Sequence, residues 1–125
     1  MNSVGWFEIY VDDMSRAKAF YEAVFLKKLE KLETPPGEGP LEMWSFSGDM
    51  QSYGANGSLV KMEGVTAGGN STIVYFSCVD CAVEEKRAAA SGGKISKSKF
   101  SIGPYGFIAL VEDTEGNMFG LHSLK

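Results

Sequence analysis

Few side chains in this sequence could do chemistry, and the first of them lies in the apolar stretch from Trp6 to Val11. Alternation along a strand places Glu8 on the same side as Trp6 and Tyr10. A carboxylate buried there without a partner would cost on the order of several kcal/mol. We therefore expect Glu8 to meet water, a ligand or a structural partner, and it is also a candidate general base. The available structural partners are Lys61, His122 and a tyrosine hydroxyl.

The second candidate is His122, the only histidine, which follows a predicted β-hairpin. Phe107 to Val111 and Met118 to Leu121 are apolar, and the polar turn Asp113 to Asn117 separates them. Gly116 within that turn can take the positive φ that a tight hairpin requires. Strand alternation places His122 and Met118 on one side, so the imidazole either contacts a ligand or satisfies nearby backbone.

The two cysteines, Cys78 and Cys81, have the CxxC spacing of redox and metal sites. A zinc site would need a second pair of ligands, which the sequence does not offer. We therefore interpret them as small buried residues at a strand-to-helix junction, with a redox role as the alternative.

Composition narrows the functional classes. A net charge of −4 without a basic run argues against nucleic acid and anionic membranes as partners. No apolar run approaches the roughly 20 residues of a membrane-spanning helix. The first residues lack the pattern of a secretory signal, so we expect a cytoplasmic protein with reduced thiols.

Two similar series of elements must position these side chains. In the first half, a strand at 6–11 precedes a helix at 14–25, capped by Asp12 or Asp13. The helix should pack one apolar face on a sheet. That face comprises Ala17, Phe20, Tyr21, Val24 and Phe25. Three strands follow, at 27–33, 41–46 and 57–62, with a turn at 34–39 and loops at 48–56 and 64–71.

The second half repeats the series. We predict a strand at 72–78, a helix at 82–91 capped by Asp80, a charged strand at 94–100 and then the hairpin. Residue matches in the same order support a duplication, for example Gly39-Pro40 with Gly103-Pro104.

These series predict one α+β domain over 1–125, built from two βαβββ modules at 1–65 and 70–125. Neither module is large enough to bury its own sheet face. We therefore expect one curved, incompletely closed mixed barrel with its helices outside, and a cleft on the concave face.

The element order and three motifs resemble the vicinal oxygen chelate superfamily, which includes glyoxalases, extradiol dioxygenases and bleomycin resistance proteins. The motifs are Val-Asp-Asp-Met-Ser-Arg-Ala-Lys-Ala-Phe-Tyr (11–21), Ser-Gly-Gly-Lys-Ile (91–95) and Glu-Asp-Thr-Glu-Gly-Asn-Met-Phe-Gly-Leu-His-Ser (112–123). The resemblance covers almost the whole chain and implies the two-module fold. It also implies a homodimer, since many relatives complete their sites across two chains.

The resemblance implies as well where metal ligands would stand. In metal-dependent relatives they come from the first and fourth strands of each half. These positions fall on Trp6 and Ile73, on Gly120, and within 57–62, where Lys61 is the nearest polar residue. Indole, isoleucine and glycine cannot hold a divalent cation. We therefore predict no metal and no cofactor.

The predicted cleft has an aromatic lining and few polar groups. Its expected ligand-binding residues are Trp6, Glu8, Tyr10, Trp44, Lys61, Ile73, Tyr75, Phe107, Met118 and His122. The leading hypothesis is a metal-independent small-molecule binding protein. One alternative is an enzyme that uses Glu8 with His122 or Tyr75 for proton transfer, as catalytic residues. Another is a metal-dependent lyase or dioxygenase with relocated ligands.

Overall fold

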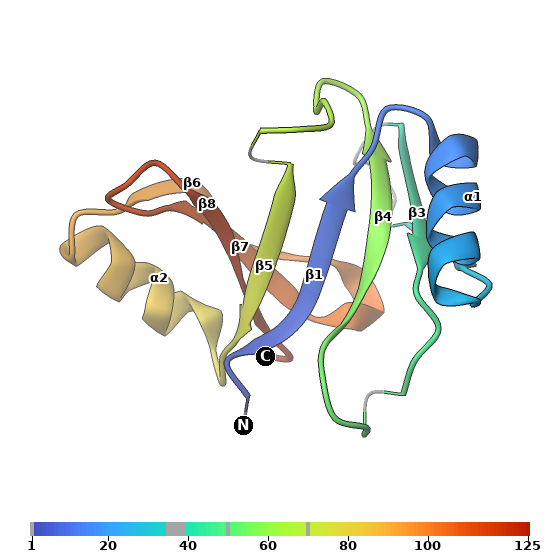
Figure 1. The fold of residues 1–125 in the computed structure, drawn as a ribbon. Coiled ribbons are helices and arrows are strands. Elements are labelled where there is room, and N and C mark those ends of the chain that lie inside the picture. Colours follow the sequence, from blue (N-terminus) through green and yellow to red (C-terminus); the bar gives the residue numbers. More distant parts are fainter. Residues whose placement is uncertain (1, 35–39, 50, 70) are drawn as a thin grey trace. The chain divides into compact units, whose positions relative to one another are not determined.

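The computed structural model describes residues 2–34, 40–49, 51–69 and 71–125 (Figure 1). The turn expected at 34–39 therefore lies almost wholly outside the described residues, as does Gly39 of the proposed duplication. The chain forms two compact units. We call residues 6–72 the N-terminal unit, and residues 1–5 together with 73–125 the C-terminal unit.

The N-terminal unit packs one helix on a mixed sheet with the strand order β2-β3-β4-β1. Strands β1 and β4 run parallel, and the other neighbours run antiparallel. Its elements are β1 (Val4–Tyr10), α1 (Met14–Phe25), β2 (Glu30–Leu32), β3 (Leu41–Ser45) and β4 (Asn56–Met62). In Figure 1, α1 runs beside this sheet, where it contacts β4.

The C-terminal unit repeats this plan with the strand order β5-β8-β7-β6. Strands β5 and β8 are parallel, whereas β7 pairs antiparallel with both β8 and β6. Its elements are β5 (Thr72–Ser77), α2 (Cys81–Ala90), β6 (Lys94–Ser101), a short 3₁₀ helix (Gly103–Tyr105), β7 (Phe107–Glu112) and β8 (Met118–Ser123). The α+β class and the two βαβββ modules are confirmed. The division falls at 72–73, and residues 1–5 join the second module.

Local sequence signals explain where these elements begin and end. Asp13 caps α1 by accepting a hydrogen bond from Arg16 N, and Asp80 caps α2 by accepting one from Ala82 N. In the β7–β8 turn, Asp113 Oδ1 accepts bonds from Glu115 N and Asn117 N, and Gly116 has φ 83°. These backbone donors lower the pKa of Asp113 and fix the predicted hairpin.

One expectation about α1 is wrong. Met14 is buried, and Ala17 and Tyr21 pack against the core formed by Val11, Met14, Leu29 and Leu59. Phe20, Val24 and Phe25, however, are each more than half exposed. Positions 20 and 24 lie farther round the helix than 14, 17 and 21, so the apolar stripe of α1 is wider than the side that packs. Phe25 lies on the packing side but is the last residue of the helix.

No helix within the described part of the chain is long and apolar enough to cross a membrane.

Candidate functional site

Glu8 is held on β1 by the two aromatic residues that flank it on the same side. Its carboxylate accepts hydrogen bonds from Trp6 Nε1 at 3.2 Å and from Tyr10 Oη at 2.9 Å. The side chain is only 8% exposed. These two donors, at positions i−2 and i+2, stabilise the buried carboxylate and so offset the desolvation cost that the sequence led us to expect.

Two serines extend this polar position across the sheet. Ser58 on β4 is the register partner of Glu8, and Ser45 on β3 is the partner of Ser58. Partners in register point to the same face of a sheet. We therefore call Glu8, Ser58 and Ser45 the polar row, and the sheet face that bears it, opposite α1, the Glu8 face.

The hydroxyls of the two serines differ in their hydrogen bonding. Ser45 Oγ donates to Phe46 O at 2.9 Å. Ser58 is fully buried, and its Oγ has no hydrogen-bond partner among the residues that the structure describes. Native proteins leave few buried polar groups unsatisfied, so Ser58 is a specific exception.

Apolar side chains flank the polar row on the Glu8 face. Tyr10, Val60 and Met43 form the next row along the register, and Trp6 pairs with Asn56 on the other side. A few polar groups among apolar and aromatic ones is the composition of a small-molecule site.

Two predicted site residues of the N-terminal unit lie on the other face. Trp44 packs against the α1 core, with Lys18 Nζ 3.3 Å from its ring centroid, and its indole donates to Glu42 Oε2 at 2.7 Å. Lys61 is the register partner of Glu42 and alternates with Val60, so it too lies on the α1 side, where it is exposed. Neither residue shares the face of Glu8.

The C-terminal unit gathers most of its predicted site residues on one face. Tyr75 pairs with Gly120 and Ser77 with His122, so these residues share a face with Ile73 and Met118. Ile73 and Tyr75 are buried. His122 Nε2 lies 2.6 Å from Tyr105 O, an interaction with backbone that was one of its two expected roles.

Phe107 lies on the opposite face of that sheet. It packs against the core that joins α2 to β7 and β8, formed by Cys81, Ala109, Val111 and Leu121. Lys99 Nζ is 4.8 Å from its ring centroid.

The residues at the family's metal-ligand positions do not fit a divalent cation. The indole N–H of Trp6 donates a hydrogen bond to Glu8, and Ile73 is apolar. Gly120 has no side chain, and a Cβ there would collide with the ring of Tyr75. Across 2–34, 40–49, 51–69 and 71–125, no three His, Cys, Asp or Glu side chains are grouped as a metal site requires.

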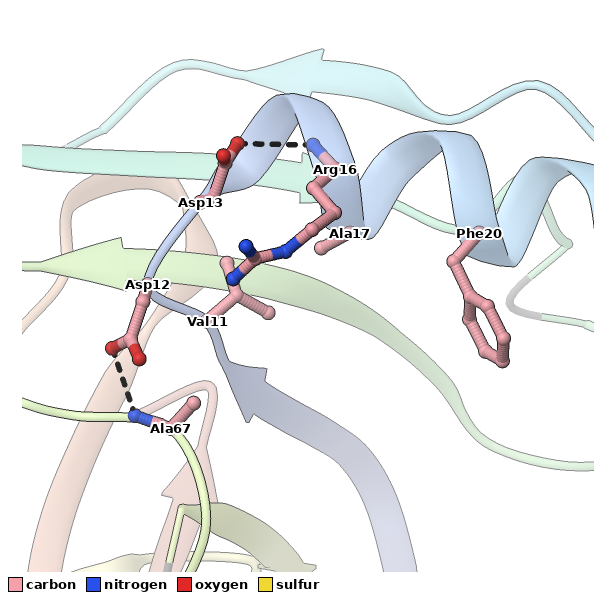
Figure 2. Close-up of a pocket in the computed structure, with 7 residues that line it drawn as sticks. All are labelled: Val11, Asp12, Asp13, Arg16, Ala17, Phe20 and Ala67. Atoms are coloured by element: carbon pink, nitrogen blue, oxygen red, sulfur yellow. Dashed lines mark hydrogen bonds between the residues drawn. The ribbon is translucent and has the colours of Figure 1, made fainter.

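Each unit has a cavity on its helix side, and the sequence predicted neither of the two. Figure 2 shows one of about 330 Å³ at the start of α1, lined by Asp12, Asp13, Arg16, Phe20 and others. There Asp12 Oδ1 accepts from Ala67 N at 3.0 Å. The other, about 410 Å³, lies between α2 and β5 and is lined by Phe76, Cys78, Glu84 and neighbours. Neither includes the polar row.

Cys78 in the second cavity is a poor nucleophile. Burial, and next the negative charge of Glu84, raise the pKa of its thiol from an ordinary value of 9.0 to about 11. Cys81 is buried in the core. Both cysteines are free. An acidic thiol of the kind that redox catalysis uses is thus not present at Cys78.

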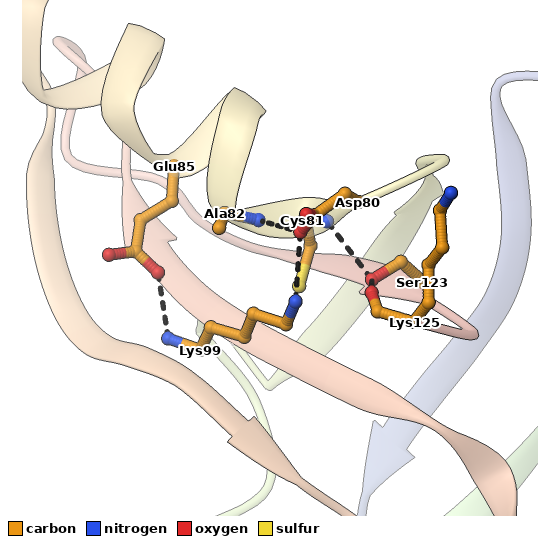
Figure 3. Close-up of polar contacts among 7 residues, drawn as sticks. All are labelled: Asp80, Cys81, Ala82, Glu85, Lys99, Ser123 and Lys125. Atoms are coloured by element: carbon orange, nitrogen blue, oxygen red, sulfur yellow. Dashed lines mark hydrogen bonds and ion pairs between the residues drawn. The ribbon is translucent and has the colours of Figure 1, made fainter.

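Another polar cluster in the C-terminal unit is structural (Figure 3). Lys99 Nζ pairs with Asp80 at 2.8 Å, and Lys99 N donates to Glu85 Oε1 at 2.7 Å. The hydrogen bond from Lys99 lowers the pKa of Asp80, and the same bond raises that of Lys99. Ser123 Oγ accepts from Cys81 N and donates to Lys125 O. These bonds tie the start of α2 to β6 and β8.

Ser58 is the residue of interest that sequence reasoning missed. Its only signal was its place in 57–62, two positions before Val60 in a strand expected to line the site. Its partnership with Glu8 depends on the β1–β4 register, which hydrophobic alternation alone does not define.

Comparisons with known proteins agree with this architecture. The family model described as the Glyoxalase/Bleomycin resistance protein/Dioxygenase superfamily matches residues 3–121. No curated protein matches the sequence. Similar solved structures include a variant of Streptomyces coelicolor methylmalonyl-CoA epimerase in complex with 2-nitronate-propionyl-CoA. It has 16% identity and a TM-score of 0.71, with 98% of this chain and 97% of that chain covered.

Two further structures have similar scores. Methylmalonyl-CoA epimerase from Mycobacterium tuberculosis has 12% identity and a TM-score of 0.69, covering 98% of this chain and 88% of that one. A hypothetical protein from Bacillus halodurans C-125 has 10% identity and a TM-score of 0.71, covering 98% and 94%. At these identities the likeness establishes the fold. Because the family model spans nearly every residue, the chain belongs to the glyoxalase/bleomycin resistance protein/dioxygenase superfamily.

Proposed function

We propose that this protein binds a small organic molecule on the Glu8 face without a metal ion. The supporting observation is the polar row, in which a buried carboxylate oriented by two aromatic donors lies beside a buried hydroxyl that has no partner among the described residues. Buried polar groups among aromatic side chains are the usual means of orienting a ligand.

The fold is compatible with this proposal. Its structural neighbours include an epimerase in complex with 2-nitronate-propionyl-CoA, so the architecture can hold an organic ligand. In this chain, the side chains at the family's metal-ligand positions do not fit a cation, and the polar row offers hydrogen-bonding groups that can orient a ligand.

A thermal-shift screen of aromatic and amphipathic metabolites, run on protein treated with a chelator, tests the proposal. We expect hits that raise the melting temperature and lose most of that shift in Glu8→Gln. Lys18→Ala is the matched control, because Lys18 lies over Trp44 on the α1 side. Hits that require added metal, or that are indifferent to Glu8→Gln, would overturn the proposal.

The same hits separate binding from catalysis. If Glu8 transferred protons, a bound carbonyl compound would exchange a carbon-bound hydrogen for deuterium in heavy water, and Glu8→Gln would abolish the exchange. We expect binding without exchange. Proton NMR of each hit over time is the measurement.

We also propose a homodimer, as the family resemblance implies. Sedimentation equilibrium should give twice the 13.5 kDa of one chain. A monomer at micromolar concentration would refute this.

A further inference from the structure

We infer that the ligand presents to Glu8 and Ser58 an uncharged group that both donates and accepts hydrogen bonds, of which an alcohol hydroxyl is the simplest. This inference rests on the proposed function and specifies the chemistry of its ligand.

The first step concerns Ser58. Its hydroxyl is fully buried and is unpartnered among the described residues, so its proton needs an acceptor. Its neighbour Ser45, in the same row, already donates to Phe46 O. Of these two serines, it is therefore Ser58 whose hydroxyl proton still needs an acceptor.

The second step concerns Glu8, the register partner of Ser58 on the adjacent strand. An ionised carboxylate accepts hydrogen bonds and never donates them. Two groups that bind it, the Trp6 indole and the Tyr10 hydroxyl, are neutral donors. A ligand group that meets both residues must accept from Ser58 and donate to Glu8.

The donor and acceptor inventory then selects the ligand. An alcohol or a primary amide both accepts and donates. An ammonium group has no acceptor for the proton of Ser58, and a carboxylate has no proton for Glu8 and would be repelled by its charge. The rest of the ligand would lie against Trp6, Tyr10, Val60 and Met43, which favours an aromatic or apolar body.

Three probes that share one ring test this inference, namely benzyl alcohol, benzylamine and benzoate. Affinities would be measured by ligand-observed NMR titration at neutral pH. We expect benzyl alcohol to bind wild-type protein about tenfold more tightly than either charged probe, the effect of roughly one hydrogen bond. Ser58→Ala should remove that preference, and Ser45→Ala should keep it.

A second measurement needs no ligand. Because the Ser58 hydroxyl has no hydrogen-bond partner in the described part of the chain, unliganded Ser58→Ala should melt at or above the wild-type temperature, whereas Ser45→Ala should melt lower. A lower melting temperature for Ser58→Ala would assign the hydroxyl a structural partner and overturn the inference.

The outcomes also separate this inference from the proposed function. Tighter binding of benzylamine or benzoate, lost in Glu8→Gln, would overturn the inference and leave metal-free binding on the Glu8 face intact. Failure of all three probes and of the metabolite screen would overturn both.

Discussion

At the scale of single residues, Tyr10 has a role that its sequence position only suggested. Its hydroxyl donates to a buried carboxylate, a kind of bond that contributes about 1.5–3 kcal/mol when the acceptor is charged. Tyr10→Phe should therefore lower the free energy of unfolding by about that amount, measured by urea denaturation. Tyr53→Phe is the control, because Tyr53 is fully exposed and should change nothing. Equal stabilities for wild type and Tyr10→Phe would contradict the assigned bond.

Cys78 allows a prediction about pH. With its pKa raised to about 11, only about one thiol in a thousand is ionised at pH 8. Its alkylation by iodoacetamide, followed by peptide mass spectrometry, should therefore accelerate up to about pH 11. Glu84→Gln should shift that midpoint downward, whereas Glu85→Gln should not, since Glu85 binds Lys99 N.

The same shift affects folding in a defined direction. The unfolded chain, with a thiol pKa near 9.0, loses its proton before the folded protein does. Any stability from the neutral thiol is thus present below pH 9 and declines as pH rises toward 11. A midpoint below 9 in the folded protein would revive the redox interpretation of the CxxC motif.

At the scale of elements, the contact of β5 with β8 depends on Gly120. Tyr75 lies across it so closely that a Cβ would overlap the ring. Gly120→Ala should cost about 1–3 kcal/mol of stability, the usual range for overpacking. Tyr75→Ala should relieve the overlap, so a double-mutant cycle should show that the two changes are coupled. Additive effects would mean that the ring does not lie over this glycine.

Most elements could be predicted from local signals, and the exceptions have identifiable causes. The bounds of α1 followed from Asp13 and the helical spacing after it, and the β7–β8 hairpin followed from the turn at 113–117. The exposure of Phe20 could not be predicted, because periodicity gives the apolar stripe but not the angle at which a helix meets its sheet.

The candidate site was predictable only along single strands. Alternation correctly grouped Glu8 with Trp6 and Tyr10, whose side chains hydrogen-bond to it. The position of Ser58 beside Glu8, and that of Lys61 on the α1 side of the sheet, depend on pairing between strands. The ion pair of Lys99 with Asp80 depends on how α2 packs against β6. Register is set by contacts between residues distant in sequence, which a single sequence does not reveal.

At the scale of the whole molecule, the residues at the family's metal-ligand positions predict how the stability of the protein responds to metals. Gly120 and Trp6 do not offer metal ligands, so chelator treatment should leave the melting temperature unchanged. Added zinc, nickel or magnesium should likewise give no shift, measured by calorimetry alongside elemental analysis. A stoichiometric metal in the purified protein, with a melting temperature that falls on its removal, would contradict the conclusion that these side chains do not fit a divalent cation.

The assignment of residues 1–5 to the C-terminal unit determines how this chain can be cut. Ser77 N donates to Ser3 O at 2.8 Å, and Gly5 lies so close to Ser77 that a Cβ would touch its hydroxyl. Expression of 73–125 alone would deprive β5 of this backbone acceptor, so such a fragment should fold poorly. A circular permutant of the full chain that joins residue 125 to residue 1 through a short glycine-serine linker and begins at residue 73 keeps this acceptor, so it should melt cooperatively where the truncated fragment does not.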